Sequence, residues 1–125
     1  MVSLPDLLRI AEVEFADIVS DSSLMETKLR IMLVDGSFMD VFLSRRLKDK
    51  SGFHWERRTV NNSLYRYDNF PDTNWQSLST YPHHFHNGTD KKVENAPFSK
   101  RPLEGFRDFM EFVRKKMAGE KDEYI

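Results

Sequence analysis

Residues 27–43 read Thr-Lys-Leu-Arg-Ile-Met-Leu-Val-Asp-Gly-Ser-Phe-Met-Asp-Val-Phe-Leu, and this stretch decides the fold. Apolar side chains occupy every second position on both sides of a central Asp-Gly, at Leu29, Ile31, Leu33, Met39, Val41 and Leu43. Alternation with a period of two is typical of half-buried strands, and Asp-Gly between two such runs predicts a β-hairpin.

The loop length of this hairpin decides which residues pair. A two-residue loop of Asp35 and Gly36 would place Asp40 opposite Ile31 and bury a carboxylate. A three-residue loop over residues 34–36, with Gly36 in the left-handed conformation, places Met39 opposite Ile31 and keeps the apolar face continuous. We therefore predict the three-residue loop.

A second hairpin is predicted from residues 53–60 and 64–69, with a two-residue turn at residues 61–62, because two asparagines tolerate positive φ. This register places Arg57 opposite Arg66, and Trp55 opposite Asp68. Two arginines directly opposite repel unless an anion or a carboxylate lies between them. The hairpin thus predicts a polar cluster of Arg57, Arg66 and Asp68; an exposed face with ordinary salt bridges is the alternative.

Helices are predicted at both ends of the chain. Ser3, Pro5 and Asp6 are typical of a helix start, and a sheet-packing stripe follows at Leu4, Leu7, Leu8, Ala11 and Phe15. Near the other end, Pro102 begins an amphipathic helix with its stripe at Leu103, Phe106, Phe109, Met110, Val113 and Met117. We expect Gly119 to end this helix and residues 118–125 to form a frayed tail.

The remaining segments carry weaker signals. Residues 17–23 indicate a short strand or an extended connection, and residues 91–101 a polar connection. Residues 70–80 have the composition of a loop, anchored by Trp75 and Leu78; a loop of this length in a compact domain is usually functional or disordered.

Residues 64–88 contain the chemistry of the chain. Arg66-Tyr67-Asp68-Asn69 precedes Thr80-Tyr81-Pro82-His83-His84-Phe85-His86, which holds three of the four histidines. Histidine titrates near neutral pH, so such a cluster suggests proton transfer or metal binding. In an extended segment His84 and His86 point to one side and His83 to the other.

Three roles remain open for these histidines. His84 and His86 could act as general acid and base in RNA cleavage, with His83 in support, Arg66 or Arg57 stabilising the phosphorane charge, and Asp68 fixing a histidine tautomer. His84, His86 and Asp68 could instead bind a divalent metal. In the third alternative the histidines are structural and the protein is a non-enzymatic binding module.

Composition limits the class of protein. A chain of 125 residues without cysteine fits one domain and excludes disulfides, thiolate catalysis and cysteine zinc sites. Neither a signal peptide nor a membrane-spanning segment is predicted, so we expect a cytoplasmic protein. The net charge is −1, but basic side chains concentrate in one strip of the sequence, at Arg45, Arg46, Lys48, Lys50, Arg57, Arg58 and Arg66. This strip could be an ordinary solvated surface or a patch that faces a phosphate.

The motifs resemble the TumE-type family of small proteins, regarded as toxins of bacterial and archaeal toxin–antitoxin modules. The resemblance covers residues 27–117 and is carried by Asp35-Gly36-Ser37, the Arg66–Asn69 tetrad and the His-His-x-His element ending at His86. Many family members carry Pro-His-His after the tetrad where this chain has Pro71-Asp72-Thr73. If those extra histidines act in catalysis elsewhere, this protein uses fewer groups or a different subset.

Together these observations predict an α+β domain over residues 1–125: an N-terminal helix, an antiparallel sheet of about four to five strands and a C-terminal amphipathic helix. The predicted function is that of a toxin acting as an endoribonuclease without a cofactor, with a metal-dependent nuclease or phosphohydrolase as the alternative. The predicted partners are a cognate antitoxin and RNA, with a homodimer left open and no membrane. Catalytic candidates are His84, His86, Arg66, Asp68 and His83, and substrate-binding candidates are Arg57, Tyr67 and Asn69.

Overall fold

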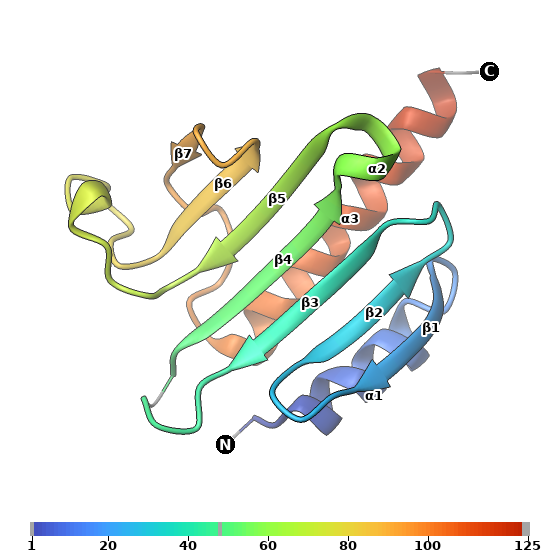
Figure 1. Cartoon of the computed structure of the whole chain (residues 1–125), viewed down its shortest axis with the longest axis horizontal. Coiled ribbons are helices and arrows are strands. Elements are labelled where there is room, and N and C mark those ends of the chain that lie inside the picture. Colours follow the sequence, from blue (N-terminus) through green and yellow to red (C-terminus); the bar gives the residue numbers. More distant parts are fainter. Residues whose placement is uncertain (1, 48, 124–125) are drawn as a thin grey trace.

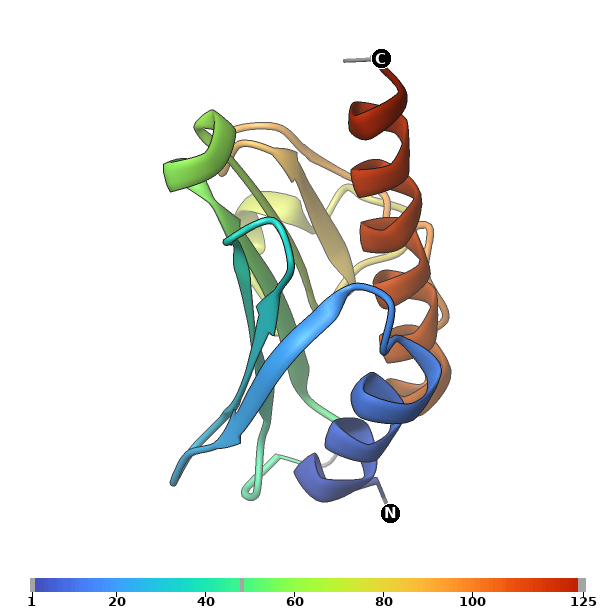
Figure 2. The same ribbon diagram turned by 90° about the vertical axis from the view of Figure 1, so that its right-hand side faces the viewer.

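The computed structural model describes residues 2–47 and 49–123. It shows an α+β fold in which two helices cover one face of an antiparallel sheet (Figures 1 and 2). The elements are α1 (Leu4–Glu14), β1 (Val19–Leu24), β2 (Leu29–Leu33), β3 (Phe38–Leu43), β4 (Ser51–Arg57), α2 (Arg58–Asn61), β5 (Ser63–Asp68), the 3₁₀ turn η1 (Thr73–Trp75), β6 (His84–Gly88), β7 (Val93–Glu94) and α3 (Pro102–Glu123).

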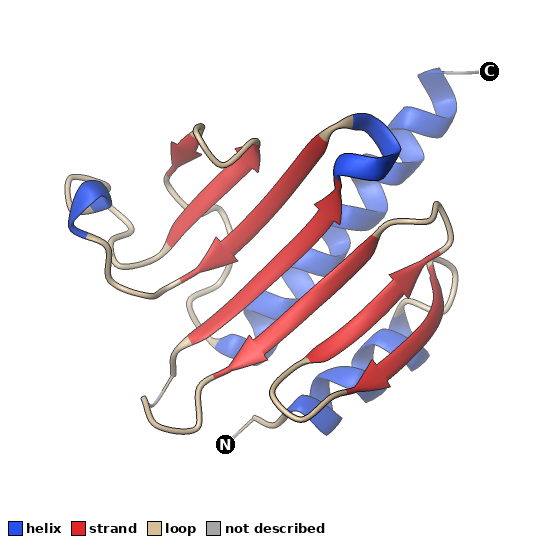
Figure 3. Ribbon diagram, viewed as in Figure 1, coloured by secondary structure: helices blue, strands red, loops and turns tan. Residues whose placement is uncertain are grey.

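The described sheet has seven strands, in the order β1-β2-β3-β4-β5-β6-β7 (Figure 3). The fold class is confirmed, but the prediction of four to five strands is too low. The two-residue strand β7 lies in a segment predicted to be a polar connection, and it pairs with β6 through Phe85–Glu94 and His86–Val93. Of residues 17–23, predicted to be a short strand or an extended connection, 19–23 belong to β1, which pairs along β2.

The hairpin of β2 and β3 has the predicted register. Ile31 pairs with Met39 and Leu29 with Val41, and Gly36 has a φ of 89°. The three-residue loop leaves an unbroken apolar face toward the helices, as the alternation requires.

The hairpin of β4 and β5 differs from the prediction. Residues 58–61 form one helical turn, α2, followed by Asn62 in the left-handed conformation with a φ of 63°. Arg66 therefore pairs with His54, and Gly52 rather than Trp55 pairs with Asp68. The predicted pairing of Arg57 with Arg66 is wrong. Because successive side chains alternate between the two faces, this odd register shift places Arg57 on the face opposite to Arg66.

Both predicted helices are present. Ser3 caps α1 and forms a capping box with Asp6. Helix α3 runs to Glu123, so the expected end at Gly119 is wrong, and residues 124–125 of the predicted tail lie outside the described part of the chain. The predicted stripes lie in the core, with the most deeply buried side chains at Leu7, Ala11, Phe106, Phe109, Met110 and Val113. None of the described helices is long and apolar enough to span a bilayer.

The helices leave the other face of the sheet uncovered (Figure 2). The strands alternate, so Phe53, Trp55, Tyr65, Tyr67 and Phe85 pack in the core beneath α1 and α3. The polar residues between them lie on the opposite face, which we call the open face, at His54, Arg66, Asp68, His84 and His86. The fold thus places the ionisable residues of three neighbouring strands together on one surface.

Candidate functional site

Two rows of polar side chains cross β4, β5 and β6 on the open face. In the first row His54 pairs with Arg66, and Arg66 with His86. In the second row Asp68 pairs with His84. Directly opposed residues on neighbouring strands lie about 5 Å apart, so these rows bring the side chains within reach of one another.

Asp68, His84 and His86 form the most compact group. One potential metal-ligand atom from each residue, a ring nitrogen or a carboxylate oxygen, lies within 4.8 Å of the other two. His84 Nε2 is 3.3 Å from Asp68 Oδ1, and the two imidazole rings are 5.1 Å apart between centroids. The structure therefore brings together the three residues that the sequence proposes as acid–base or metal-binding groups.

Backbone carbonyls fix both rings. His84 Nδ1 is 3.1 Å from Pro82 O, and His86 Nδ1 is 3.0 Å from Asp90 O. A carbonyl only accepts, so each Nδ1 carries a proton, and in a neutral ring the lone pair is then on Nε2. A nitrogen with a free lone pair can accept a proton or bind a metal.

Arg66 lies beside this group. Its Nε donates to Asp68 Oδ2 at 2.7 Å, while neither Nη group donates a hydrogen bond among the residues described. Gly52 makes room for the guanidinium, because a Cβ at that position would lie 3.1 Å from Nη2. Asp68 also accepts from the backbone N–H of Phe70 at 3.1 Å. The hydrogen bond from Nε to Asp68 thus orients the guanidinium, and its two Nη groups face the open face.

Burial differs between the two histidines. His84 is 4% exposed, whereas His86 is half-buried. Trp75, from the loop between β5 and β6, lies against both rings, with centroid distances of 6.5 Å to His84 and 6.4 Å to His86. Burial lowers the pKa of His86, and the positive charge of Arg66 acts in the same direction, whereas the hydrogen bond to Asp90 O and the carboxylate of Asp68 oppose it without reversing the shift. His86 is therefore a neutral base around pH 7.

His83 points to the other side of the sheet, as predicted for an extended segment. Its ring lies against Tyr67, with centroids 5.8 Å apart. Neither of its ring nitrogens has a hydrogen-bond partner within residues 2–47 and 49–123, and burial lowers its pKa. The structure thus separates His83 from the other two histidines.

Arg57 lies away from the site, contrary to the predicted cluster. Its side chain is 1% exposed and forms ion pairs with Asp35, at 2.9 Å, and with Glu120, at 2.6 Å. Its guanidinium also stacks on Trp55, 4.4 Å from the ring centroid. Burial alone would lower the pKa of Arg57, but the hydrogen bonds to Glu120 and Asp35 outweigh it and raise the pKa. This arginine ties β4 to the β2–β3 loop and to α3.

The other two predicted substrate-binding residues also have packing contacts. Tyr67 is in the core, and its hydroxyl donates to Ser99 O at 2.8 Å. Asn69 is buried and accepts from the backbone N–H of Ser51 at 2.9 Å, while its amide donates to Asp49 O. Both side chains hold neighbouring segments in place, and that of Tyr67 lies in the core, away from the open face.

The predicted basic strip is divided between different environments. Arg45 and Arg46 are exposed in the connection between β3 and β4, whereas Lys48 lies outside the described residues. Arg58 pairs with Glu56 at 2.6 Å. Of the two arginines predicted to face each other, only Arg66 contributes charge to the open face.

His54 is the residue of this face that the sequence interpretation missed. It lies next to Arg66 only because β4 ends at Arg57 and the helical turn α2 shifts the register. Its alternation with Phe53 and Trp55 in the strand was the available signal, since it places His54 on the face opposite to the core.

Imidazole, carboxylate and guanidinium groups side by side can carry acid–base or metal chemistry, so this cluster on the open face is the candidate functional site. Comparison with known proteins identifies the family. The model of the family described as "Toxin TumE" matches residues 6–117, and the chain belongs to this family. No curated protein and no solved structure matches the chain. Membership in a toxin family implies a toxin-like role in a toxin–antitoxin module, and with it an antitoxin partner.

Proposed function

We propose that this toxin is an endoribonuclease that cleaves RNA in the cytoplasm by histidine acid–base chemistry and is held inactive by its antitoxin. The observation that carries the proposal is the convergence of Asp68, His84 and His86 within 4.8 Å beside the guanidinium of Arg66. Ionisable groups gathered in this way occur far more often at functional sites than elsewhere.

The residues divide the chemistry between them. The Nη groups of Arg66 bind the scissile phosphate and stabilise the charge of the phosphorane. His86, neutral and half-buried, accepts the proton of the 2′-hydroxyl through Nε2. The 2′-oxygen then bonds to phosphorus as the bond to the 5′-oxygen breaks and the 5′-oxygen takes up a proton, which leaves a 2′,3′-cyclic phosphate and a 5′-hydroxyl.

His84 has a different place in this scheme. It is buried beneath Trp75 and lies between two oxygen acceptors, Pro82 O and Asp68 Oδ1. We therefore assign His84 to hold Asp68, which in turn orients Arg66, and we assign direct contact with the RNA to His86.

The test is cleavage of a labelled single-stranded RNA in the presence of a chelator. We expect the wild type to cleave and His86→Ala to lose about 10²–10⁴-fold in rate, the contribution of a general base. His83→Ala is the matched control, because its ring lies across the sheet from the site. Equal cleavage by the wild type and by His84→Ala and His86→Ala would remove these histidines from the mechanism. Intact RNA with all four proteins, together with a loss of stability in the variants, would instead favour a binding module with structural histidines.

The second candidate is a metal-dependent nuclease or phosphohydrolase. The hydrogen bonds from each Nδ1 to a carbonyl favour it, because metal-binding histidines typically donate their other N–H to such an acceptor. Asp68, His84 and His86 would hold the ion, and a divalent metal there would polarise the phosphate or activate water. Loss of cleavage in the chelator, restored by one added divalent metal, would select this candidate over the first.

A further inference from the structure

His54 has the features of a second substrate-contacting histidine. It lies on β4, on the open face, and its side chain is 21% exposed. Nε2 lies 3.1 Å from Glu56 Oε1, so a carboxylate holds this nitrogen and leaves Nδ1 to exchange a proton. The hydrogen bond from Arg58 to Glu56 lowers the pKa of Glu56 to about 2, so the carboxylate is ionised throughout the neutral range.

The sheet places this histidine across Arg66 from the proposed base. His54 and His86 each pair directly with Arg66 from the strands on its two sides. Two strand spacings put their backbones about 10 Å apart, so imidazoles leaning inward can reach opposite sides of one bound phosphate. His86 is then beside the attacking oxygen when His54 is beside the leaving oxygen.

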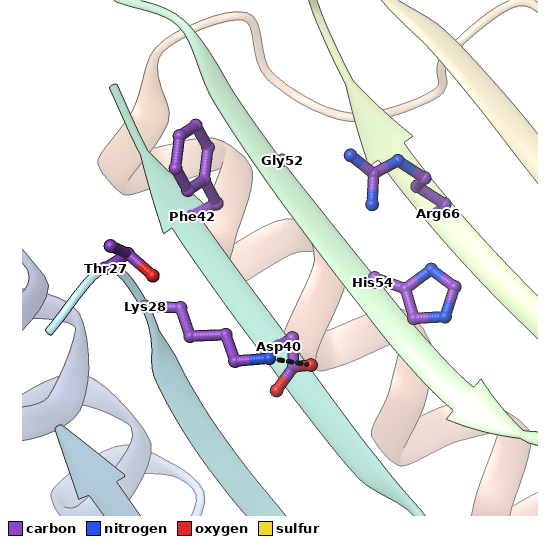
Figure 4. Close-up of a pocket in the computed structure, with 7 residues that line it drawn as sticks. All are labelled: Thr27, Lys28, Asp40, Phe42, Gly52, His54 and Arg66. Atoms are coloured by element: carbon purple, nitrogen blue, oxygen red, sulfur yellow. Dashed lines mark hydrogen bonds and ion pairs between the residues drawn. The ribbon is translucent and has the colours of Figure 1, made fainter. Parts of the chain in front are cut away.

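A hollow on the His54 side of Arg66 offers room for the leaving nucleotide. Its volume is about 360 Å³, within the roughly 300–1,000 Å³ typical of small-ligand sites. Figure 4 shows the arginine and His54 side chains on one side of it and the Phe42 ring on the other. Phe42 is 38% exposed, and its ring lies 5.8 Å from that of Phe70, which makes an aromatic surface on which a base can stack.

In the floor of the hollow the negative charge of Asp40 is balanced by basic side chains. Asp40 lies opposite His54 in the β3–β4 pairing and is bound by Lys28, at 3.0 Å, and by Arg30, at 2.8 Å. Lys28 can donate hydrogen bonds to a base or a ribose and Asp40 can accept them, and the cations around Asp40 offset its repulsion of the phosphate.

We infer that His54 is the general acid of the site, with the hollow between Phe42 and Arg66 holding the nucleotide on the leaving side. The inference rests on the proposed ribonuclease function. As the 2′-oxygen bonds to phosphorus and its proton passes to His86, the bond from phosphorus to the 5′-oxygen breaks and that oxygen takes the proton from Nδ1 of His54. One proton is accepted and one donated, so the histidines end with their protonation states exchanged.

The experiment uses two RNA oligonucleotides with a single cleavable linkage, one ordinary and one with sulfur in place of the bridging 5′-oxygen. A thiolate leaves without a proton, so the second substrate does not need a general acid. We expect His54→Ala and His54→Asn to cleave the ordinary linkage about 10²–10⁴-fold more slowly than the wild type and the sulfur linkage within tenfold of it. His86→Ala, which lacks the base, should be slow on both, and thermal unfolding of each variant verifies that it is folded.

Each other outcome overturns a defined part of the scheme. Wild-type rates for both His54 variants on the ordinary linkage, or equal losses on both substrates, would overturn the role of His54 while leaving the ribonuclease proposal intact. A wild-type protein that cleaves neither substrate would overturn both the proposed function and the role of His54.

The Phe42→Ala variant tests the hollow separately. Loss of one stacked base should weaken binding of a non-cleavable 2′-O-methyl oligonucleotide by roughly fivefold or more. The exposed Val13, on α1, provides the matched Val13→Ala control, and equal binding by both variants would exclude the hollow as the nucleotide site.

Discussion

Replacing Arg57 by methionine separates the structural arginine of β4 from the functional arginine of β5. The substitution keeps much of the apolar stem over Trp55 but removes the guanidinium that lies between Asp35 and Glu120. Because both carboxylates then lose their cation in a partly buried setting, the folded state is destabilised. The open face does not change, since Arg57 points away from it.

The magnitude follows from the burial of the three groups. Breaking a buried ion pair by removing one partner costs roughly 3–5 kcal/mol. The side chains of Asp35 and Glu120 are 22% and 28% exposed, so water can partly solvate them, and we expect a loss at the lower end, about 3 kcal/mol. For a chain of this length that loss lowers the melting temperature by roughly 10 °C.

The assay combines thermal unfolding with RNA binding measured below both melting temperatures. Arg66→Met is the matched control. Arg66 is 37% exposed and Asp68 keeps its other partners, so this variant should lose only about 1 kcal/mol of stability but most of its RNA binding. A stable Arg57→Met variant with weakened RNA binding would refute the reasoning, because it would place Arg57 on the RNA surface.

Four further predictions concern the histidine base and two glycines. His86 has a lowered pKa, so on the acidic side the cleavage rate should begin to fall only once the pH drops below about 6.5. A pH–rate profile with its acidic limb above pH 7 would contradict this. The same shift means that the unfolded chain takes up the His86 proton first, so unfolding titrations should show stability declining as the pH falls below about 6.5. Gly52→Ala should raise the KM for RNA more than it lowers kcat, because its Cβ would lie 3.1 Å from Arg66 Nη2 and must displace the guanidinium; an unchanged KM would show that the position of the guanidinium does not limit RNA binding. Gly105→Ala should lower the melting temperature, because its Cβ would lie 2.6 Å from the backbone oxygen of Ser99, and an unchanged melting temperature would show that this loop yields freely.

The sequence predicts the parts of the fold that local patterns control. The register of β2 and β3 follows from the cost of burying Asp40 in the apolar face, and that cost needs no knowledge of the rest of the chain. The apolar stripes of α1 and α3 are equally local, since each has the spacing of a helix with one buried side.

The errors arise where distant residues decide the outcome. The segment between β4 and β5 can form either a tight turn or one helical turn that ends at Asn62, and local sequence does not decide between them. Arg57 contacts Glu120, which is far away in the sequence, only in the folded protein. That contact favours the register that buries Arg57 and brings His54 to Arg66. The burial of His84 likewise depends on where the loop carrying Trp75 folds back, which the composition of that loop does not determine.

The most direct test of the central claim is the chemistry of the cleaved ends. RNA cleaved by the wild-type protein in a chelator should carry a 2′,3′-cyclic phosphate on one fragment and a 5′-hydroxyl on the other, both visible by mass spectrometry, and the same oligonucleotide methylated at every 2′-oxygen should stay intact. Cleavage of the methylated strand, or fragments ending in a 5′-phosphate, would contradict an attack by the 2′-hydroxyl assisted by histidines around Arg66.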